Sequence, residues 1–304
     1  MFGECLYWVI NMSIIASFMG LIVLLIRAIR VIPRRVSIFL WMIPFLRMCI
    51  PVSLNNPYSL MTFISRFTTR TITVYQPIDN IEISKINSIM AADRYSPITY
   101  KVDLLDDILA IASWIWLAIA LIIILVLAGL YVMTLREVKK TRHLRDNIYL
   151  SDSFQSPAVY GIFKPRIVLP SSYASGDNQY ILRHEITHIR HLDNLWRILT
   201  LLIVSVHWFN PFSWLFLRLF FADIELACDE SAIAGYNEEQ RKEYATSLVN
   251  EAERKSLFAS AFGGAQLGKR IVNILSYKKM TGLSLLGFSA LILSIIFVLL
   301  TNAG

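Results

Sequence analysis

Cysteine is scarce in this chain of 304 residues, which contains three: Cys5, Cys49 and Cys228. They lie far apart in the sequence, and two of them stand in apolar runs. A disulfide framework needs an even set of cysteines at suitable spacings, and a cysteine metal knuckle needs a C-x-x-C pair. Both kinds of scaffold are therefore excluded, and cysteine chemistry does not define the class of this protein.

Nucleic-acid-binding motifs are also absent, although the net charge is +7. The basic residues cluster beside apolar runs. Lysine and arginine at the ends of apolar segments set the orientation of a membrane protein, because they resist translocation. The positive charge therefore indicates membrane topology, and we expect no direct binding of nucleic acid.

Hydrophobic residues make up 56% of the chain and its mean hydropathy is +0.54, which is too apolar for an ordinary soluble protein. A cleavable signal peptide is not expected, because the first apolar stretch has neither a basic segment before it nor a small-x-small cleavage site. Four stretches approach the length of about 20 apolar residues that crosses a bilayer core. These predicted spans are residues 5–26, 36–54, 108–133 and 280–300.

Basic residues near the span ends predict which segments face the cytoplasm. They stand after the first span, after the third span and before the fourth span. The N-terminus, a loop at 55–107 and the last residues should then face outward. The predicted regions are an N-terminal membrane region at 1–134, a cytoplasmic domain at 135–279 and a C-terminal span within 280–304.

The cytoplasmic segment begins with a predicted β-hairpin or edge strand. In the sequence SPAVYGIFKPRIVLP, at 156–170, apolar β-forming residues flank a turn between Gly161 and Pro165. Such a strand can bind an extended peptide by strand addition, or it can be only the edge of a sheet. From Asn178 onward the pattern is helical. We therefore expect a mainly α membrane protein with an α+β cytoplasmic domain between the third and fourth spans.

A metal-binding pattern lies in the sequence RHEITHIRHLDN, at 183–194. His184 and His188 are four residues apart, so on a helix both imidazoles lie on one face and can reach one ion. Glu185 lies off that face but can reach a water at an open coordination position. A catalytic zinc ion takes three protein ligands and a water, from which a carboxylate can remove a proton. The pattern predicts a hydrolytic zinc site, and the alternative is an exposed helix turn.

The third ligand is predicted downstream, in the sequence ADIELACDES at 222–231. Glu225 and Asp229 are four residues apart and share a face of another expected helix. Glu225 can complete the site as the third ligand, and Asp229 can accept a hydrogen bond from the second nitrogen of a ligand histidine. The alternatives are a solvated acidic face, a ligand role for Cys228, and a contribution from His191, which is awkward on one straight helix.

The apolar segment between these two motifs, at 195–223, tests this hypothesis. A fifth span there would place the motifs on opposite sides of the membrane. Asn210 and Pro211 interrupt the segment, because proline halts a helix and restricts the residue before it. The two arms are then too short to span, so we predict a hairpin that returns the chain to the cytoplasmic side. At its tip, His207 can be a polar cap at the interface or a donor to the reacting group.

Four motifs in this order resemble the BlaR/MecR family of integral-membrane zinc peptidases, the β-lactam-sensing antirepressor proteases. They are SPAVYGIFKPRIVLP, RHEITHIRHLDNLWR, HWFNPFSWLFLR and DIELACDESA. The resemblance covers 156–232, and the four-span topology extends it over the chain. It implies a gluzincin-like cytoplasmic domain, with Zn²⁺ held by His184, His188 and Glu225 and with Glu185 as general base.

The resemblance also implies partners and a location. Members of the family act in a bacterial cell membrane and cleave themselves or a winged-helix transcriptional repressor, which releases genes for an antibiotic or stress response. The sensing members carry a penicillin-binding-type domain after the last span, whereas this sequence stops at Gly304. Direct covalent sensing of β-lactams is therefore not expected, and a signal would enter through the 55–107 loop or a partner protein.

Three functions are compatible with these patterns. The first is a signalling zinc endopeptidase with a protein substrate, embedded in the lipid bilayer and able to form a homo-oligomer. The second is housekeeping proteolysis that resembles the prenyl-protease and heat-shock membrane peptidases, which use a similar H-E-x-x-H and distal glutamate. The third is a receptor or scaffold with a structural zinc site, which requires four protein ligands. The three expected ligands and Glu185 favour the enzymatic hypotheses.

Overall fold

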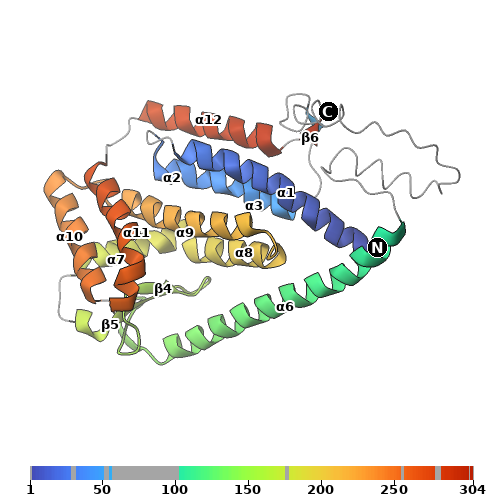
Figure 1. Ribbon diagram of the computed structural model, residues 1–304. Coiled ribbons are helices and arrows are strands. Elements are labelled where there is room, and N and C mark those ends of the chain that lie inside the picture. Colours follow the sequence, from blue (N-terminus) through green and yellow to red (C-terminus); the bar gives the residue numbers. More distant parts are fainter. Residues whose placement is uncertain are drawn as a thin grey trace.

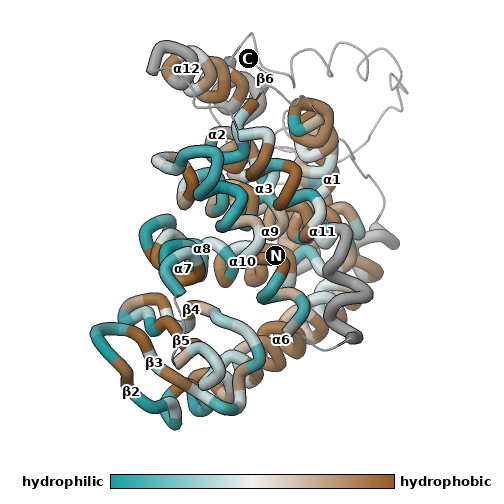
Figure 2. Tube along the Cα trace, turned by 90° about the vertical axis from the view of Figure 1, so that its left-hand side faces the viewer, coloured by the Kyte–Doolittle hydropathy of each residue, from teal (hydrophilic) through white to brown (hydrophobic). Residues whose placement is uncertain are grey.

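The computed structural model of the protein describes residues 2–28, 32–50, 55–56, 103–174, 178–254, 257–277, 282–300 and 302–303. The predicted outer loop at 55–107 lies almost entirely outside these residues. Figure 1 shows a helical bundle with a small sheet on one side, and Figure 2 shows α6 and α12 as mainly hydrophobic. The expected mainly α fold with a small β component is therefore confirmed.

The two longest apolar helices agree with the first and third predicted spans. They are α1 (Phe2–Arg27) and α6 (Asp103–Lys139). Within them, the segments Cys5–Arg27 and Ile108–Lys139 are long and apolar enough to cross a membrane. Half of the first segment is buried but only 6% of the second, since α6 runs along the outside of the bundle (Figure 1).

The second and fourth predicted spans are shorter in the structure. Residues 36–54 fall in α2 (Arg34–Ser37), the 3-10 turn η1 (Ile38–Trp41) and α3 (Met42–Cys49). Pro44 stands in the first turn of α3, where a missing N–H is tolerated. The last span falls in α12 (Gly282–Leu300), which has a shorter apolar part. Among the described residues, two helices, not four, have the length and hydropathy of a span.

A four-stranded sheet with the order β2-β3-β5-β4 follows α6. Its strands are β2 (Arg142–Arg145), β3 (Ile148–Ser151), β4 (Ala158–Tyr160) and β5 (Arg166–Pro170). β4 and β5 are antiparallel, with Val159 opposite Ile167, and β4 is an edge strand, so the predicted hairpin is confirmed. Gly161 has φ 90°, and a Cβ there would lie 2.9 Å from a backbone oxygen, so the turn requires glycine.

The helices after the sheet surround α9. They are α7 (Gln179–His191), α8 (Asp193–Val206), α9 (Pro211–Ala232), α10 (Glu238–Arg254) and α11 (Leu257–Leu275). A 3-10 turn, η2 (Ser171–Tyr173), connects the sheet with this group, and β1 (Asn55–Asn56) pairs in parallel with β6 (Asn302–Ala303). The helical pattern expected from Asn178 onward is therefore confirmed.

The turn between α8 and α9 is anchored to α1. The side-chain oxygen of Asn210 accepts a hydrogen bond from the backbone N–H of Phe212 at 2.9 Å and so caps α9, whose first residue is a proline. The amide nitrogen of Asn210 donates to the hydroxyls of Ser13 and Ser17, each at 2.9 Å. The chain reverses at 207–210, so the end of α9 returns to the beginning of α8.

The largest hydrophobic core joins α1, η1, α3, α8, α9 and α12. Its buried members include Ile15, Trp41, Phe216, Phe220 and Ile224. The ring of Phe216 packs directly on α1, because a Cβ on Gly20 would lie only 2.1 Å from it. This close contact fixes α9, the helix that carries Glu225 and Asp229, against the N-terminal helices.

Candidate active site

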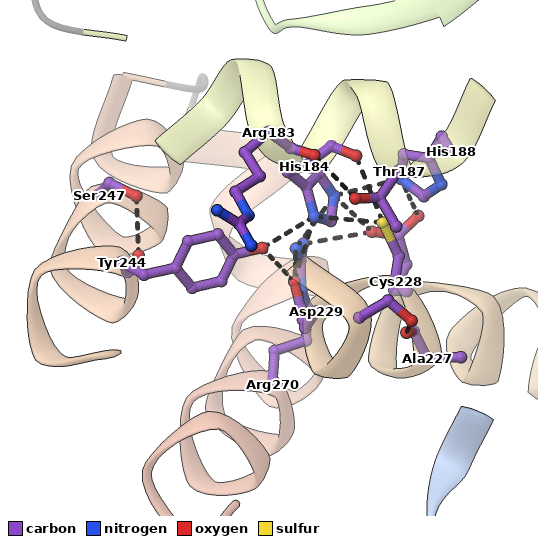
Figure 3. Close-up of polar contacts among 12 residues, drawn as sticks. Arg183, His184, Thr187, His188, Ala227, Cys228, Asp229, Tyr244, Ser247 and Arg270 are labelled. Atoms are coloured by element: carbon purple, nitrogen blue, oxygen red, sulfur yellow. Dashed lines mark hydrogen bonds and ion pairs between the residues drawn. The ribbon is translucent and has the colours of Figure 1, made fainter. Parts of the chain in front are cut away.

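The first two predicted ligands lie one turn apart on α7. His184 and His188 are buried, and their Nε2 atoms are 3.1 Å apart. Figure 3 shows both imidazoles extending from α7 toward α9. The spacing of four residues therefore brings the two rings together on one face, as the sequence predicts.

Glu225 approaches the two histidines from α9. Its carboxylate oxygens lie 3.5 Å from Nε2 of His184 and 3.7 Å from Nε2 of His188. Around a tetrahedral zinc ion with bonds of about 2.0–2.2 Å, neighbouring ligand atoms are about 3.3–3.6 Å apart. The separations in the protein are close to this range. The three side chains therefore fit a zinc ion with one open position.

The second nitrogen of His188 contacts Asp193. His188 Nδ1 lies 2.6 Å from Asp193 Oδ2. Asp193 is the first residue of α8, where the positive end of the helix dipole favours a carboxylate. Leu192 stands between α7 and α8 with φ 56°, a left-handed conformation that turns the chain sharply and returns Asp193 to His188. A carboxylate at Nδ1 leaves the lone pair of Nε2 for a metal.

The second nitrogen of His184 faces Asp229 and Tyr244. His184 Nδ1 lies 3.2 Å from Asp229 Oδ1 and 2.9 Å from the hydroxyl of Tyr244. That hydroxyl donates to Asp229 at 2.7 Å, so its oxygen can accept a hydrogen bond from His184. Asp229 therefore lies where the sequence analysis expects it. Tyr244 comes from α10, and no pattern near the histidines points to it.

Two arginines that the sequence analysis does not single out neutralise the carboxylates. Arg270 of α11 contacts Asp229 at 2.7 Å and Glu225 at 3.3 Å, and Arg197 of α8 donates to Glu225 at 2.6 Å. Burial alone would raise the pKa of Asp229, but Arg270 and His184 lower it to about 2. Burial also opposes ionisation of Glu225, but His184 and Arg270 hold its pKa well below the usual value. Both groups are therefore anionic at neutral pH.

Glu185 is buried next to the ligand histidines. Burial raises its pKa, and the positive charges of His184 and His188 oppose this effect without cancelling it. The pKa of Tyr160 on β4 is also raised, first by burial and then by the charge of Glu185, which places this carboxylate near the edge strand. A carboxylate with a raised pKa suits a base that accepts a proton near neutral pH.

Three other candidates from the sequence have different positions in the structure. Cys228 lies beside the two histidines, with its Sγ within 4.8 Å of a ring nitrogen of each, so these three residues are a second possible metal-binding set. The same sulfur lies 3.5 Å from Nδ1 of His184. His191 lines a separate groove, and His207 lies in the turn at the far end of α8. This distance from the histidine pair favours a role for His207 as a polar cap at the interface and not as a donor to the reacting group.

Zinc affinity is expected to rise with pH. Burial alone would lower the pKa of His188, but its hydrogen bond with Asp193 and its contact with Cys228 raise it to about 10 in the metal-free protein. Zinc must displace this proton, so the apparent affinity should increase about ten-fold per pH unit for each proton released between about pH 6 and pH 8. Calorimetric titrations in buffers of different ionisation enthalpy measure both the affinity and the proton release.

Protonation of His188 weakens zinc binding but stabilises the fold of the metal-free protein. The pKa of His188 is raised from 6.5 to about 10, so the stabilisation by its ion pair with Asp193 is complete below about pH 6.5 and is lost as the pH rises toward 10. Thermal unfolding of the metal-free protein should therefore occur at lower temperature in alkaline buffer. A zinc affinity independent of pH would contradict this description of His188.

The chain is similar to known proteins over most of its length. The family model described as BlaR1 peptidase M56 matches residues 7–274. The regulatory protein BlaR1 of Bacillus licheniformis is 25% identical over 170 residues, which cover 52% of this chain and 28% of that protein. The methicillin resistance mecR1 protein of Staphylococcus aureus (strain Mu50) is 27% identical over 113 residues, covering 36% and 19%. BlaR1 of Staphylococcus aureus is 27% identical over 135 residues, covering 41% and 23%.

The two kinds of match differ in extent. The alignments with the curated relatives span 28% or less of the length of those proteins, so they describe only a part of each. The family match, in contrast, contains most of α1, the sheet, the H-E-x-x-H helix, α9 and nearly all of α11. Because it extends over most of the sequence, this chain belongs to the BlaR1 peptidase M56 family.

Proposed function

We propose that this protein is a membrane-embedded zinc endopeptidase that acts in signal transduction. The observation that carries the proposal is the convergence of His184, His188 and Glu225 from two helices, with Glu185 buried beside them. The substrate is a protein, which we propose to be a winged-helix transcriptional repressor, the chain itself, or both. The names of the relatives BlaR1 and mecR1 support a regulatory role in an antibiotic or stress response.

Each residue of the candidate site would have its own role in peptide hydrolysis. A bound zinc ion would polarise the scissile carbonyl and lower the pKa of a water. Glu185 would accept the proton of the attacking water and later transfer it to the leaving amine. Asp193 and Asp229 would hold the tautomers of His188 and His184. This mechanism requires that one coordination position of the zinc ion has no protein ligand.

The edge strand β4 is the proposed contact for an extended substrate. It is one of the two outer strands of the four-stranded sheet, and its Tyr160 is near Glu185. The amide of Asn194 donates to the carbonyl oxygens of Val159 at 2.9 Å and Gly161 at 3.3 Å. A peptide that adds to β4 would therefore have to pair beside these two contacts or replace them.

The alternative is a structural zinc site, with Cys228 as a further ligand. A closed site needs four protein ligands, and Cys228 is the nearest candidate for a fourth. Its sulfur donates to the backbone carbonyl of His184 at 3.4 Å and contacts Nδ1, whereas the lone pairs available to a metal are on Nε2. This arrangement favours a packing role for Cys228 and an open catalytic site.

The proposed location is a bacterial cell membrane, with several spans, the N-terminus outside and the active site facing the cytoplasm. The basic residues that follow α1 and end α6 support this orientation, since such residues resist translocation. The helical hairpin of α8 and α9 would then enter the membrane from the cytoplasmic side. We propose no contact with nucleic acid, and a homo-oligomer is compatible with this placement.

Removal of zinc should abolish proteolysis. The experiment uses the full chain in detergent, loaded with Zn²⁺ and incubated with candidate winged-helix repressors and, separately, alone. Cleavage should stop after chelation and return when zinc is restored, because the ligand set requires an ion for water activation. Unchanged cleavage after complete chelation would reject the zinc mechanism. Equal cleavage of an unrelated unfolded protein would favour the housekeeping function instead.

A further inference from the structure

An apolar groove lies beside α8. It has a volume of about 430 Å³ and lies between η1, α3, α8 and α9. This size is within the range of small-molecule sites in proteins, about 300–1,000 Å³. The deeper lining residues include Phe45, Leu46, Ile203 and Phe220. Phe39 and Leu199 are 53% and 40% exposed at its margin, so the groove is open along its length.

The groove and the candidate metal ligands lie on different sides of α9, although Asp193 borders both. Ala227 and Ser231 line the groove, whereas Glu225 and Asp229 point to the histidines. Two residues along a helix correspond to a rotation of about 200°, so the groove and the ligands lie on opposite faces of α9. The groove is therefore not the cleft that presents a peptide to Glu185.

The two ends of the groove differ in polarity. Arg35, His191 and Asp193 line one end, and Leu46 and Ile203 line the other. From Asp193 to Ile203, α8 rises about 15 Å, which is half of the roughly 30 Å hydrocarbon core of a bilayer. The polar end is at the end of the bundle proposed to face the cytoplasm. The groove thus has the length and the polarity of one lipid leaflet.

Two hydrogen-bond donors, Arg35 and His191, line the polar end of the groove. Arg35 contacts the hydroxyl of Tyr277 at 2.9 Å and lies 3.9 Å from Glu230, and its side chain is 35% exposed. Burial lowers the pKa of His191, Asp193 opposes this effect, and the charges of His188 and Arg35 add to it, so Arg35 lies near this imidazole. The negative charge of Asp193 is directed to His188, at 2.6 Å. A phosphate would therefore find donors at Arg35 and His191.

We propose that this groove binds one acyl chain of an anionic phospholipid of the cytoplasmic leaflet, with its phosphate at Arg35 and His191. A partner helix about 10 Å wide could place only one face of its side chains in the groove, whereas an acyl chain can enter it along its length. The proposal rests on the membrane position of α3 and α8 and does not depend on peptidase activity. Its test therefore measures bound lipid.

Native mass spectrometry can count the retained lipid. The full chain is extracted from vesicles of equal parts phosphatidylglycerol and phosphatidylcholine and exchanged into lipid-free detergent. One phosphatidylglycerol per chain should be retained, with about five-fold preference over phosphatidylcholine that Arg35→Gln abolishes. Leu199→Trp should fill the groove and remove the lipid. Leu202→Trp is the matched control, since Leu202 is also 40% exposed on α8 but lies outside the groove.

Each result decides the proposal. Loss of lipid in Leu199→Trp with retention in Leu202→Trp supports it, provided that both variants keep the helical circular dichroism of the natural protein. Equal retention in the two variants would overturn it, and so would equal retention of the two lipids by the natural protein. Slower peptide cleavage by Leu199→Trp with unchanged lipid would place the substrate in the groove and also overturn the proposal.

Discussion

The Glu185→Gln variant is expected to cleave peptide bonds about 10²–10⁴-fold more slowly than the natural protein. Glutamine has nearly the same shape as glutamate but cannot accept the proton of an attacking water. The three proposed ligands, His184, His188 and Glu225, are unchanged, so the zinc content should stay the same. Single-turnover cleavage and metal analysis of the same preparation measure the two quantities separately.

Thermal unfolding of Glu185→Gln distinguishes a loss of catalysis from misfolding. Burial raises the pKa of Glu185, so its ionised form destabilises the fold at pH values above that raised pKa. Glutamine carries no charge, and the variant should unfold at an equal or higher temperature. The control is Glu239→Gln, at the exposed beginning of α10, which should change neither rate nor stability. Cleavage at the natural rate by Glu185→Gln would refute its role as general base.

The second large effect is expected from the link between α9 and the N-terminal helices, which is formed by Asp223 with Arg27 and Trp41. Asp223→Ala should lower the free energy of unfolding by about 3–5 kcal/mol, as expected when one partner of a buried ion pair is removed. The carboxylate of Asp223 is fully buried and accepts hydrogen bonds from Arg27 at 2.7 and 2.9 Å and from the indole of Trp41 at 2.9 Å. Arg27 is only 22% exposed, so its charge would lose its partner without gaining full hydration.

Two variants control for this prediction. Asp223→Asn keeps an acceptor oxygen but loses the charge, so it should be less destabilising than alanine. Glu137→Ala removes an exposed pair with Lys140, whose members are 47% and 70% exposed, and should cost about 1 kcal/mol or less. Equilibrium unfolding in mixed micelles measures all three. If Asp223→Ala lowers the free energy of unfolding no more than Glu137→Ala does, the link contributes little to stability.

This link has a consequence for the site, because α9 is anchored on both sides of the proposed ligand. Glu230 accepts hydrogen bonds from the backbone N–H groups of Arg34 and Arg35, each at 3.1 Å. Glu225 lies between Asp223 and Glu230 on the same helix. The position of this carboxylate is therefore set by contacts with the N-terminal helices as well as by the helix itself.

Local patterns were sufficient to predict several parts of this structure. The spacing of His184 and His188 predicts their common face because helical geometry repeats every 3.6 residues. Asn210 and the proline after it predict the reversal between α8 and α9, since backbone restrictions of proline act on adjacent residues. The strands β2 and β3 were not predicted, because each has only four residues and β2 is exposed along its whole length.

The sequence by itself determined the candidate groups of the site and the helices that carry them, because their spacings on each helix are within one or two helical turns. The returning hairpin followed from the proline after Asn210, since proline restricts the backbone beside it. Tertiary structure alone decided which distant groups surround the candidate groups. Tyr244 and Arg270 reach His184 from 60 and 86 residues away, and Asp223 pairs with Arg27 across 196 residues. Such contacts leave no periodic pattern in the sequence, because they arise only when separate helices pack against one another.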